Sequence, residues 1–131
     1  MKVTRPMLAA AGAVAALALA GCASQAERAA VPEPATGSLE QLAAEVKCTP
    51  DIQIDTDDFR QALCKGDDEK YVLLTFATDR GQRDWINEAK PYGGHYLVGR
   101  KWIAVGDESV VTSLRGELGG DVEVGRDHSG H

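Results

Sequence analysis

The chain has 131 residues, and its 20 acidic side chains outnumber its 14 basic ones, which gives a formal net charge of −6. This balance argues against nucleic-acid binding and against the binding of a polybasic segment to anionic lipid, because both need clustered Lys and Arg. The length fits one small domain.

The N-terminus has the three parts of an export signal: a basic head at Lys2 and Arg5, an Ala/Leu/Val-rich run over 7–20, and small residues before Cys22. The apolar run is short for a membrane span, which needs roughly 20 apolar residues. The sequence Leu-Ala-Gly-Cys at 19–22 resembles the lipobox of bacterial lipoproteins. This resemblance implies that residues 1–21 are a signal peptide and that Cys22 carries a diacylglycerol, which would anchor the protein to the cell membrane on the side away from the cytoplasm. The alternatives are an ordinary secretory signal or a buried apolar helix.

Cleavage after residue 21 would remove two basic residues and no acids, which changes the net charge to about −8. With Cys22 assigned to lipid, Cys48 and Cys64 remain as an even pair in an oxidising compartment, and we expect a disulfide between them. A redox-active pair or a metal site is the alternative, but there is no C-x-x-C spacing and no second ligand pair nearby.

Residues 22–37 are rich in Ala, Pro, Glu and Ser, which predicts a flexible tether. Ser38 followed by Gln41 forms a capping box for a helix that ends near Cys48, with an apolar face made by Leu39, Leu42, Ala43 and Val46. After Pro50, alternating Ile52 and Ile54 predict a short strand that runs into an acidic turn at 55–58.

The segment 59–65 is compatible with a helical turn or a strand, and we favour a strand that forms a hairpin with residues 71–76, the best candidate for a central strand. Asp79 with Gln82 predicts a second capped helix, which Pro91 ends. Residues 96–98 and 102–105 then form a hairpin through a Gly99-Arg100 type II′ turn.

Asp107 caps a third helix with a core face of Val110, Val111, Leu114 and Leu118, which ends at Gly119-Gly120. Val122 and Val124 predict a last short strand, and 125–131 read as a disordered, histidine-containing tail.

The order of elements over 71–124 is β-α-β-β-α-β. It predicts an α+β domain over 38–124 with a ferredoxin-like core, in which two helices pack on one face of an antiparallel sheet, preceded by a helix and a disulfide-linked hairpin. The alternative is a sheet extended by the preceding hairpin, with the helix that follows Ser38 covering an edge.

The stretch 71–105 contains TFAT at the end of a strand, an aromatic helix, a PYGG turn and a YLVG hairpin. With these motifs it resembles a family of small lipoproteins and secreted domains from high-GC actinobacteria, over about 48–124. The resemblance implies the fold and the location and supplies no catalytic or binding residues.

Three groups of residues are candidate sites, and each also has a plain structural interpretation. Asp127, His128 and His131 could bind copper, nickel or zinc weakly, although a mobile terminus lacks the supporting contacts of a preformed site. The acidic turn at 55–58 does not fit a calcium loop, because Phe59 and Arg60 stand where that loop needs other residues. His95 could place a general base, but no nucleophile motif accompanies it, and we interpret it as a turn histidine.

Aromatic residues concentrate between 85 and 102, and Tyr92, Tyr96 and Trp102 are candidates for an interaction patch. We expect a non-enzymatic binding or structural module, with no cofactor beyond the covalent diacylglycerol and with the membrane and an unknown protein or small molecule as partners. The alternative is a weak extracytoplasmic metal-binding protein that uses the histidine tail.

Overall fold

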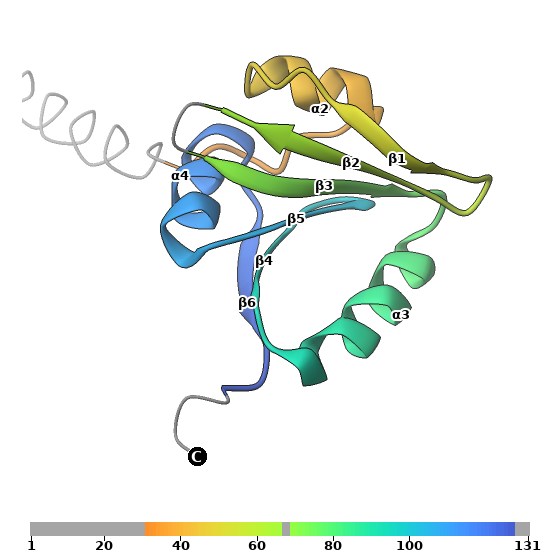
Figure 1. Ribbon diagram of the computed structural model, residues 1–131, viewed down its shortest axis with the longest axis vertical. Coiled ribbons are helices and arrows are strands. Elements are labelled where there is room, and N and C mark those ends of the chain that lie inside the picture. The colour runs from red at the N-terminus through yellow and green to blue at the C-terminus, as the bar shows by residue number, and fades with distance from the viewer. Residues whose placement is uncertain (1–30, 67–68, 128–131) are drawn as a thin grey trace, which may run out of the picture. The chain divides into compact units, whose positions relative to one another are not determined.

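The computed structural model describes residues 31–66 and 69–127. Within these residues the chain forms three α-helices and one six-stranded sheet (Figure 1). The elements are α2 (Leu39–Glu45), β1 (Asp51–Asp55), β2 (Phe59–Lys65), β3 (Lys70–Phe76), α3 (Asp79–Ala89), a 3₁₀ turn (Lys90–Tyr92), β4 (His95–Val98), β5 (Trp102–Gly106), α4 (Glu108–Leu118) and β6 (Asp121–Val124).

All neighbouring strands are antiparallel, and their order across the sheet is β1-β2-β3-β5-β4-β6. The predicted strand over 59–65 is confirmed as β2, and its hairpin with β3 runs in register from Phe59 opposite Phe76 to Lys65 opposite Lys70. The β1–β2 hairpin therefore extends the sheet, as in the alternative considered above.

The mixed α+β class is confirmed, but the ferredoxin-like topology is not. A ferredoxin-like sheet would place β6 beside β3 and both helices on one face, whereas β6 pairs with β4 at the edge. β3 runs parallel to β4, and β5 runs parallel to β6, so each pair is joined by a helical crossover. Both crossovers, from β3 to β4 and from β5 to β6, move toward the edge formed by β6. The strands from which they start, β3 and β5, are antiparallel. Right-handed crossovers of this kind put their helices on opposite faces.

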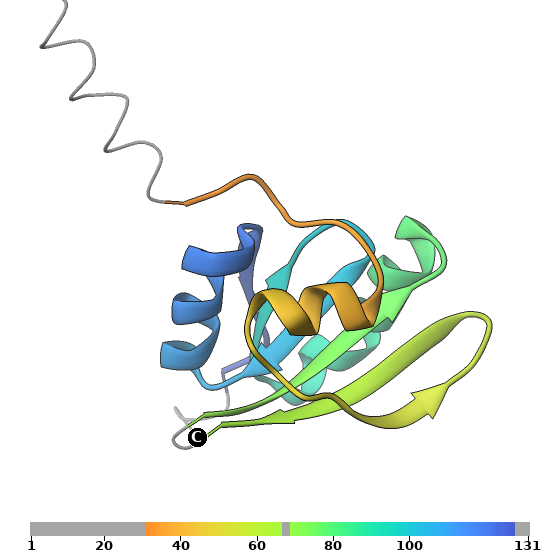
Figure 2. The same cartoon turned by 90° about the horizontal axis from the view of Figure 1, so that it is seen from above.

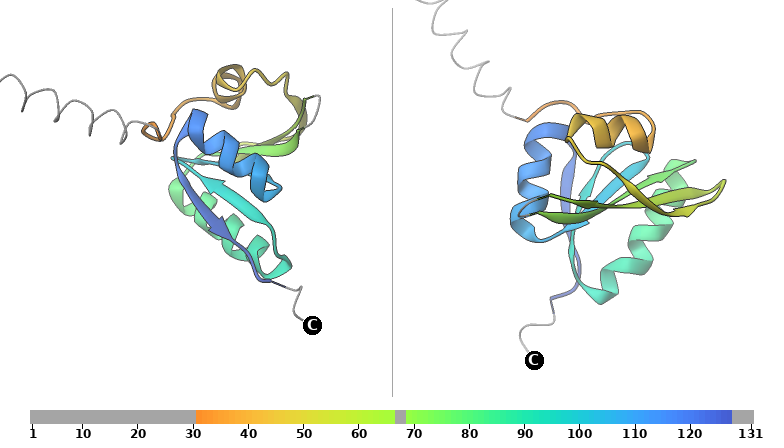
Figure 3. Two further views of the ribbon diagram at one scale, coloured as in Figure 1. Left: turned by 90° about the vertical axis from the view of Figure 1, so that its left-hand side faces the viewer. Right: turned by 45° about the horizontal axis from the view of Figure 1, so that its top comes forward.

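Figures 1 and 3 show this division, with α2 and α4 on one side of the sheet and α3 on the other. Seen from above, α2 lies in front of the strands, with α4 to its left (Figure 2). Adjacent residues of β3 contribute to the cores on opposite faces of the sheet. Leu73 belongs to the core under α2 and α4, and Leu74 belongs to the core under α3. This alternation follows from the two-residue period of a strand. The second part of the alternative, in which the helix after Ser38 covers an edge of the sheet, is wrong, because α2 packs on a face.

The start of α2 is confirmed in detail. The amide of Gln41 donates to Ser38 Oγ (3.1 Å) and the amide of Ser38 donates to Gln41 Oε1 (2.8 Å), which completes the capping box. The helix ends at Glu45, before the predicted Cys48, because Lys47 takes a left-handed φ of 58° and the Cys48 amide donates back to Ala43.

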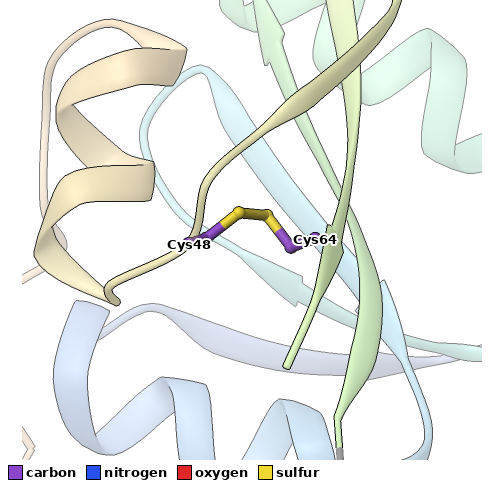
Figure 4. Close-up of a disulfide and its surroundings, with 2 residues drawn as sticks. All are labelled: Cys48 and Cys64. Atoms are coloured by element: carbon purple, nitrogen blue, oxygen red, sulfur yellow. A yellow bond between two sulfur atoms is a disulfide. The ribbon is translucent and has the colours of Figure 1, made fainter. Parts of the chain in front are cut away.

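Helix α2 is held to the sheet by a disulfide and by ion pairs. The predicted Cys48–Cys64 bond is present and joins the segment after α2 to β2 (Figure 4). Arg60 on β2 donates to both carboxylate oxygens of Glu40 (2.7 and 2.8 Å) and, through Nε, to Asp55 (3.1 Å). The hydrogen bonds from Arg60 lower the pKa of Glu40 to about 2.

The predicted cap of α3 is wrong by one residue. Thr78 is the N-cap, and its Oγ1 accepts a hydrogen bond from the Gly81 amide (3.0 Å). Gln82 is instead buried, and its Nε2 donates to the carbonyl oxygens of Gly99 (2.8 Å) and Trp102 (2.9 Å). The side chain that we assigned to capping therefore ties α3 to the β4–β5 hairpin.

The turn of that hairpin also differs from the prediction. The positive φ lies at Lys101 (60°) and not at Gly99. Gly99 is required for space, because a Cβ atom there would lie 1.9 Å from Cε2 of Trp102. Segment 31–37, predicted as part of a flexible tether, contacts the folded domain through Ala35, which packs against the core under α2 and α4.

Candidate functional site

The structure separates the three aromatic residues of the predicted patch. Trp102 is 0% exposed and Tyr96 is 4% exposed, so neither is available on the surface. Tyr92 is 87% exposed. The patch inferred from closeness in sequence therefore reduces to Tyr92, because alternation along β4 and β5 turns the other two rings into the cores.

Tyr92 ends the 3₁₀ turn Lys90–Tyr92, which begins directly after α3. Gly93 and Gly94 follow with φ of 92° and 104°, a backbone that other residues rarely adopt. The Tyr96 hydroxyl donates to the Gly93 carbonyl, and the Gly93 amide donates to Lys90 (2.9 Å). These two hydrogen bonds fix the turn, and both are formed within the segment 90–96.

The C-terminal segment braces this turn from the other side. The amide of Gly125 donates to Gly94 (2.8 Å) and that of Arg126 donates to Lys90 (2.8 Å). Position 125 has no room for a side chain, because a Cβ atom would lie 2.6 Å from the Gly93 backbone. In Figure 1 the end of β6 accordingly meets the connection between α3 and β4.

An ion-pair network joins α3 to β6 beside the turn. Arg83 donates to both carboxylate oxygens of Glu123 (2.9 and 2.8 Å), and Lys90 Nζ donates to Oε1 of the same residue. The hydrogen bond from Arg83 is the main cause that lowers the pKa of Glu123 to about 2. Glu123 is therefore ionised at neutral pH and holds the 3₁₀ turn against the edge strand.

Tyr92 lines two hollows. One of about 510 Å³ is lined by Trp85, Glu88, Ala89, Pro91 and Tyr92. A second, of about 460 Å³, lies between Tyr92, the Gly93–His95 backbone and the segment 124–127, and it includes Val124, which is 59% exposed. We call the exposed residues Glu88, Pro91, Tyr92, Val124 and Arg126 the Tyr92 surface.

A larger hollow of about 550 Å³ lies elsewhere on the domain, between the β4–β5 loop and the start of α3. Its lining residues are Thr36, Gly37, Thr75, Phe76, Asp79, Arg100 and Lys101. Sequence reasoning missed it, because the four segments that build it are brought together only by the fold. The one local signal is the pair of adjacent cations in the turn.

His95 is half-buried, and its Nε2 lies 3.6 Å from a carboxylate oxygen of Glu108. Asp127 is exposed, whereas His128, His131 and the lipid-attachment candidate Cys22 lie outside the described residues. Across 31–66 and 69–127, no group of three or more His, Cys, Asp or Glu is placed to hold a metal ion.

Among the described residues, no helix has the length and apolar character needed to cross a membrane. Comparison of the chain with protein-family models, with curated proteins and with solved structures finds no match.

Proposed function

We propose that the protein is a lipid-anchored, extracytoplasmic lipoprotein whose domain is a non-enzymatic binding module. The anchoring part rests on the basic head, the short apolar run and the lipobox-like sequence that ends at Cys22. The Cys48–Cys64 disulfide supports the location, because disulfides persist mainly in oxidising compartments. Two acyl chains on Cys22 would hold a small domain stably at the membrane.

The binding part rests on one observation: Tyr92 is 87% exposed while the turn that carries it is fixed by backbone hydrogen bonds at both ends. A tyrosine on a fixed turn offers a large contact area, and its few rotatable bonds keep the cost in conformational entropy small; tyrosine is also enriched among the residues that dominate binding energy at interfaces. The hollows beside the ring offer places for side chains of a partner. A protein surface is the ligand that best fits an exposed ring that lines two open hollows.

Anchoring is tested by membrane fractionation of the wild type and Cys22→Ala. The proposal expects the wild type in the membrane fraction with a mature N-terminus at Cys22. Cys22→Ala should remain uncleaved or leave the membrane fraction. Normal processing and membrane association of Cys22→Ala would contradict lipid attachment at this residue.

Binding is tested by mild-detergent purification of wild type, Tyr92→Ala and Ile52→Ala. Ile52 is a matched control, because it is an exposed apolar side chain (38%) on β1, at the opposite edge of the sheet. A stoichiometric partner should be retained by wild type and by Ile52→Ala and lost from Tyr92→Ala. Retention of the partner by Tyr92→Ala at wild-type levels would contradict a binding role for this surface.

A further inference from the structure

We propose that the hollow between the β4–β5 loop and the start of α3 binds a small, hydroxyl-rich organic anion such as a sugar acid, with Arg100 and Lys101 holding the anionic group. Its volume of about 550 Å³ lies in the range of small-molecule sites, about 300–1,000 Å³. This site is separate from the Tyr92 surface and shares no lining residue with it.

The walls of the hollow are fixed to one another. The Phe76 amide donates to the Lys101 carbonyl (2.8 Å), which joins the end of β3 to the loop. Gln82 of α3 donates to Gly99 in the same loop (2.8 Å). Trp102 Nε1 donates to the Ala35 carbonyl (2.8 Å), next to Thr36 and Gly37 in the remaining wall. A ligand would therefore meet a largely preformed site, which keeps the entropic cost of binding low.

The two cations are available. Arg100 and Lys101 are exposed, and neither forms an ion pair with another residue in 31–66 or 69–127. In the same part of the chain Arg60, Arg83 and Lys90 are each paired with a carboxylate. A guanidinium and an ammonium side by side match a carboxylate or phosphate group through charge-assisted hydrogen bonds.

Lys101 occupies a backbone conformation that favours glycine. Its φ is 60°, and in hairpin loops the residue in this conformation is commonly glycine. A lysine here lowers backbone stability relative to glycine, and it places a cation among the residues that line the hollow. The position therefore allows a variant that removes the cation without straining the fold, Lys101→Gly.

The other polar groups favour hydroxyls on the ligand. Asp79 would repel a bare anion, but its carboxylate can accept hydrogen bonds from hydroxyl groups. Thr36 and Thr75, whose hydroxyls can both donate and accept hydrogen bonds, also line the hollow. A ligand with one anionic group and several hydroxyls satisfies all of these side chains, whereas a simple phosphate or a neutral sugar satisfies only some.

The test is a titration of the full chain in detergent, in which amide NMR shifts of Thr75 and Lys101 are followed with glucuronate, glucose and inorganic phosphate. We expect saturable shifts with glucuronate and at least tenfold weaker binding of glucose and of phosphate. Glucose or phosphate binding as tightly as glucuronate would overturn the ligand class, and absence of saturable shifts with glucuronate would overturn the site.

The variants Arg100→Ala and Lys101→Gly should each weaken glucuronate binding about tenfold, because each removes a charge-assisted contact. Lys101→Gly should do so without lowering the melting temperature, which separates lost recognition from lost folding. Lys65→Ala removes an exposed cation at the end of β2, outside both the hollow and the Tyr92 surface, and should leave the affinity unchanged. Unchanged affinity in both Arg100→Ala and Lys101→Gly would overturn the proposal.

Discussion

The indole nitrogen of Trp102 donates a hydrogen bond to the carbonyl oxygen of Ala35 (2.8 Å), across 67 positions of sequence. The amide of Ala35 in turn donates to Leu118 at the end of α4 (2.8 Å). Ala35 is thus held through its carbonyl oxygen by the β4–β5 hairpin and through its amide by the end of α4. The folded part of the chain therefore begins before Ser38, and the end of the predicted tether forms part of the domain.

We predict that Trp102→Phe lowers the free energy of unfolding by about 2 kcal/mol, because it removes a buried donor and some core volume. Trp85→Phe is the matched control, since Trp85 is half-buried and contacts Phe76 and Tyr96 through its ring. It should lose less than about 1 kcal/mol. Urea unfolding measures both, and equal losses would refute a specific role for the indole hydrogen bond.

Two glycine substitutions should have opposite effects. Gly99→Ala would place its Cβ atom 1.9 Å from the Trp102 indole, and we expect a loss of about 3 kcal/mol or more, since Trp102 is fully buried in the core and the clash would force the indole to shift. Gly116 lies inside α4, and a Cβ atom there meets nothing within 4 Å, so Gly116→Ala should gain about 0.5–1 kcal/mol. Thermal unfolding compares the two, and a neutral Gly99→Ala would contradict the packing described for this turn.

The disulfide is predicted to contribute about 3 kcal/mol to stability, because it closes a loop with a sequence separation of 16. Cys48→Ser/Cys64→Ser should be less stable than the wild type by this amount in urea. Under reducing conditions the wild type should approach the stability of the double variant, while the variant itself should not change. A wild type that resists complete reduction without loss of stability would count against this contribution.

The ion pairs of Glu123 predict a specific pH dependence. Because Arg83 lowers the folded-state pKa of Glu123 to about 2, below its ordinary 4.5, the stabilisation is fully present above about pH 4.5 and is lost as the pH falls toward 2. Glu123→Gln should therefore cost about 1 kcal/mol at pH 6, a modest value because the Arg83 side chain is 45% exposed, and almost nothing near pH 2.

Urea unfolding at pH 6, 4 and 2.5 measures this difference. The control is Glu88→Gln, which changes an exposed carboxylate on α3, the helix that carries Arg83. It should match the wild type within about 0.5 kcal/mol at each pH. A Glu123→Gln deficit that stays constant down to pH 2.5 would contradict the assigned ion pairs.

Local patterns predicted the elements well, because each pattern reflects a face that must be buried. Val110, Val111, Leu114 and Leu118 are all buried on α4 as their spacing required. The sheet order could not be read in this way. The β-α-β-β-α-β series permits the last crossover to advance in either direction across the sheet, and only contacts between distant segments place β6 beside β4.

The candidate site shows the same limit at the level of single residues. Tyr92, Tyr96 and Trp102 are close in sequence, but the alternation of β4 and β5 and the packing of α2 and α3 decide which rings are covered. Gln82 fits a capping box by spacing, yet Thr78 lies one residue before Asp79 and takes the capping role. The cap at Thr78 is a local feature that the sequence offered, but the burial of Gln82 depends on Gly99 and Trp102, which lie 17 and 20 positions further along the chain.

The central claim, that an anchored domain presents Tyr92 to a partner outside the membrane, is tested most directly by photo-cross-linking in intact cells. A photoreactive phenylalanine analogue would replace Tyr92 in one variant and Ile52 in the other. The account predicts a discrete cross-linked product from position 92, which depends on Cys22, and none from position 52. Equal yields from the two positions, or no product from position 92, would contradict it.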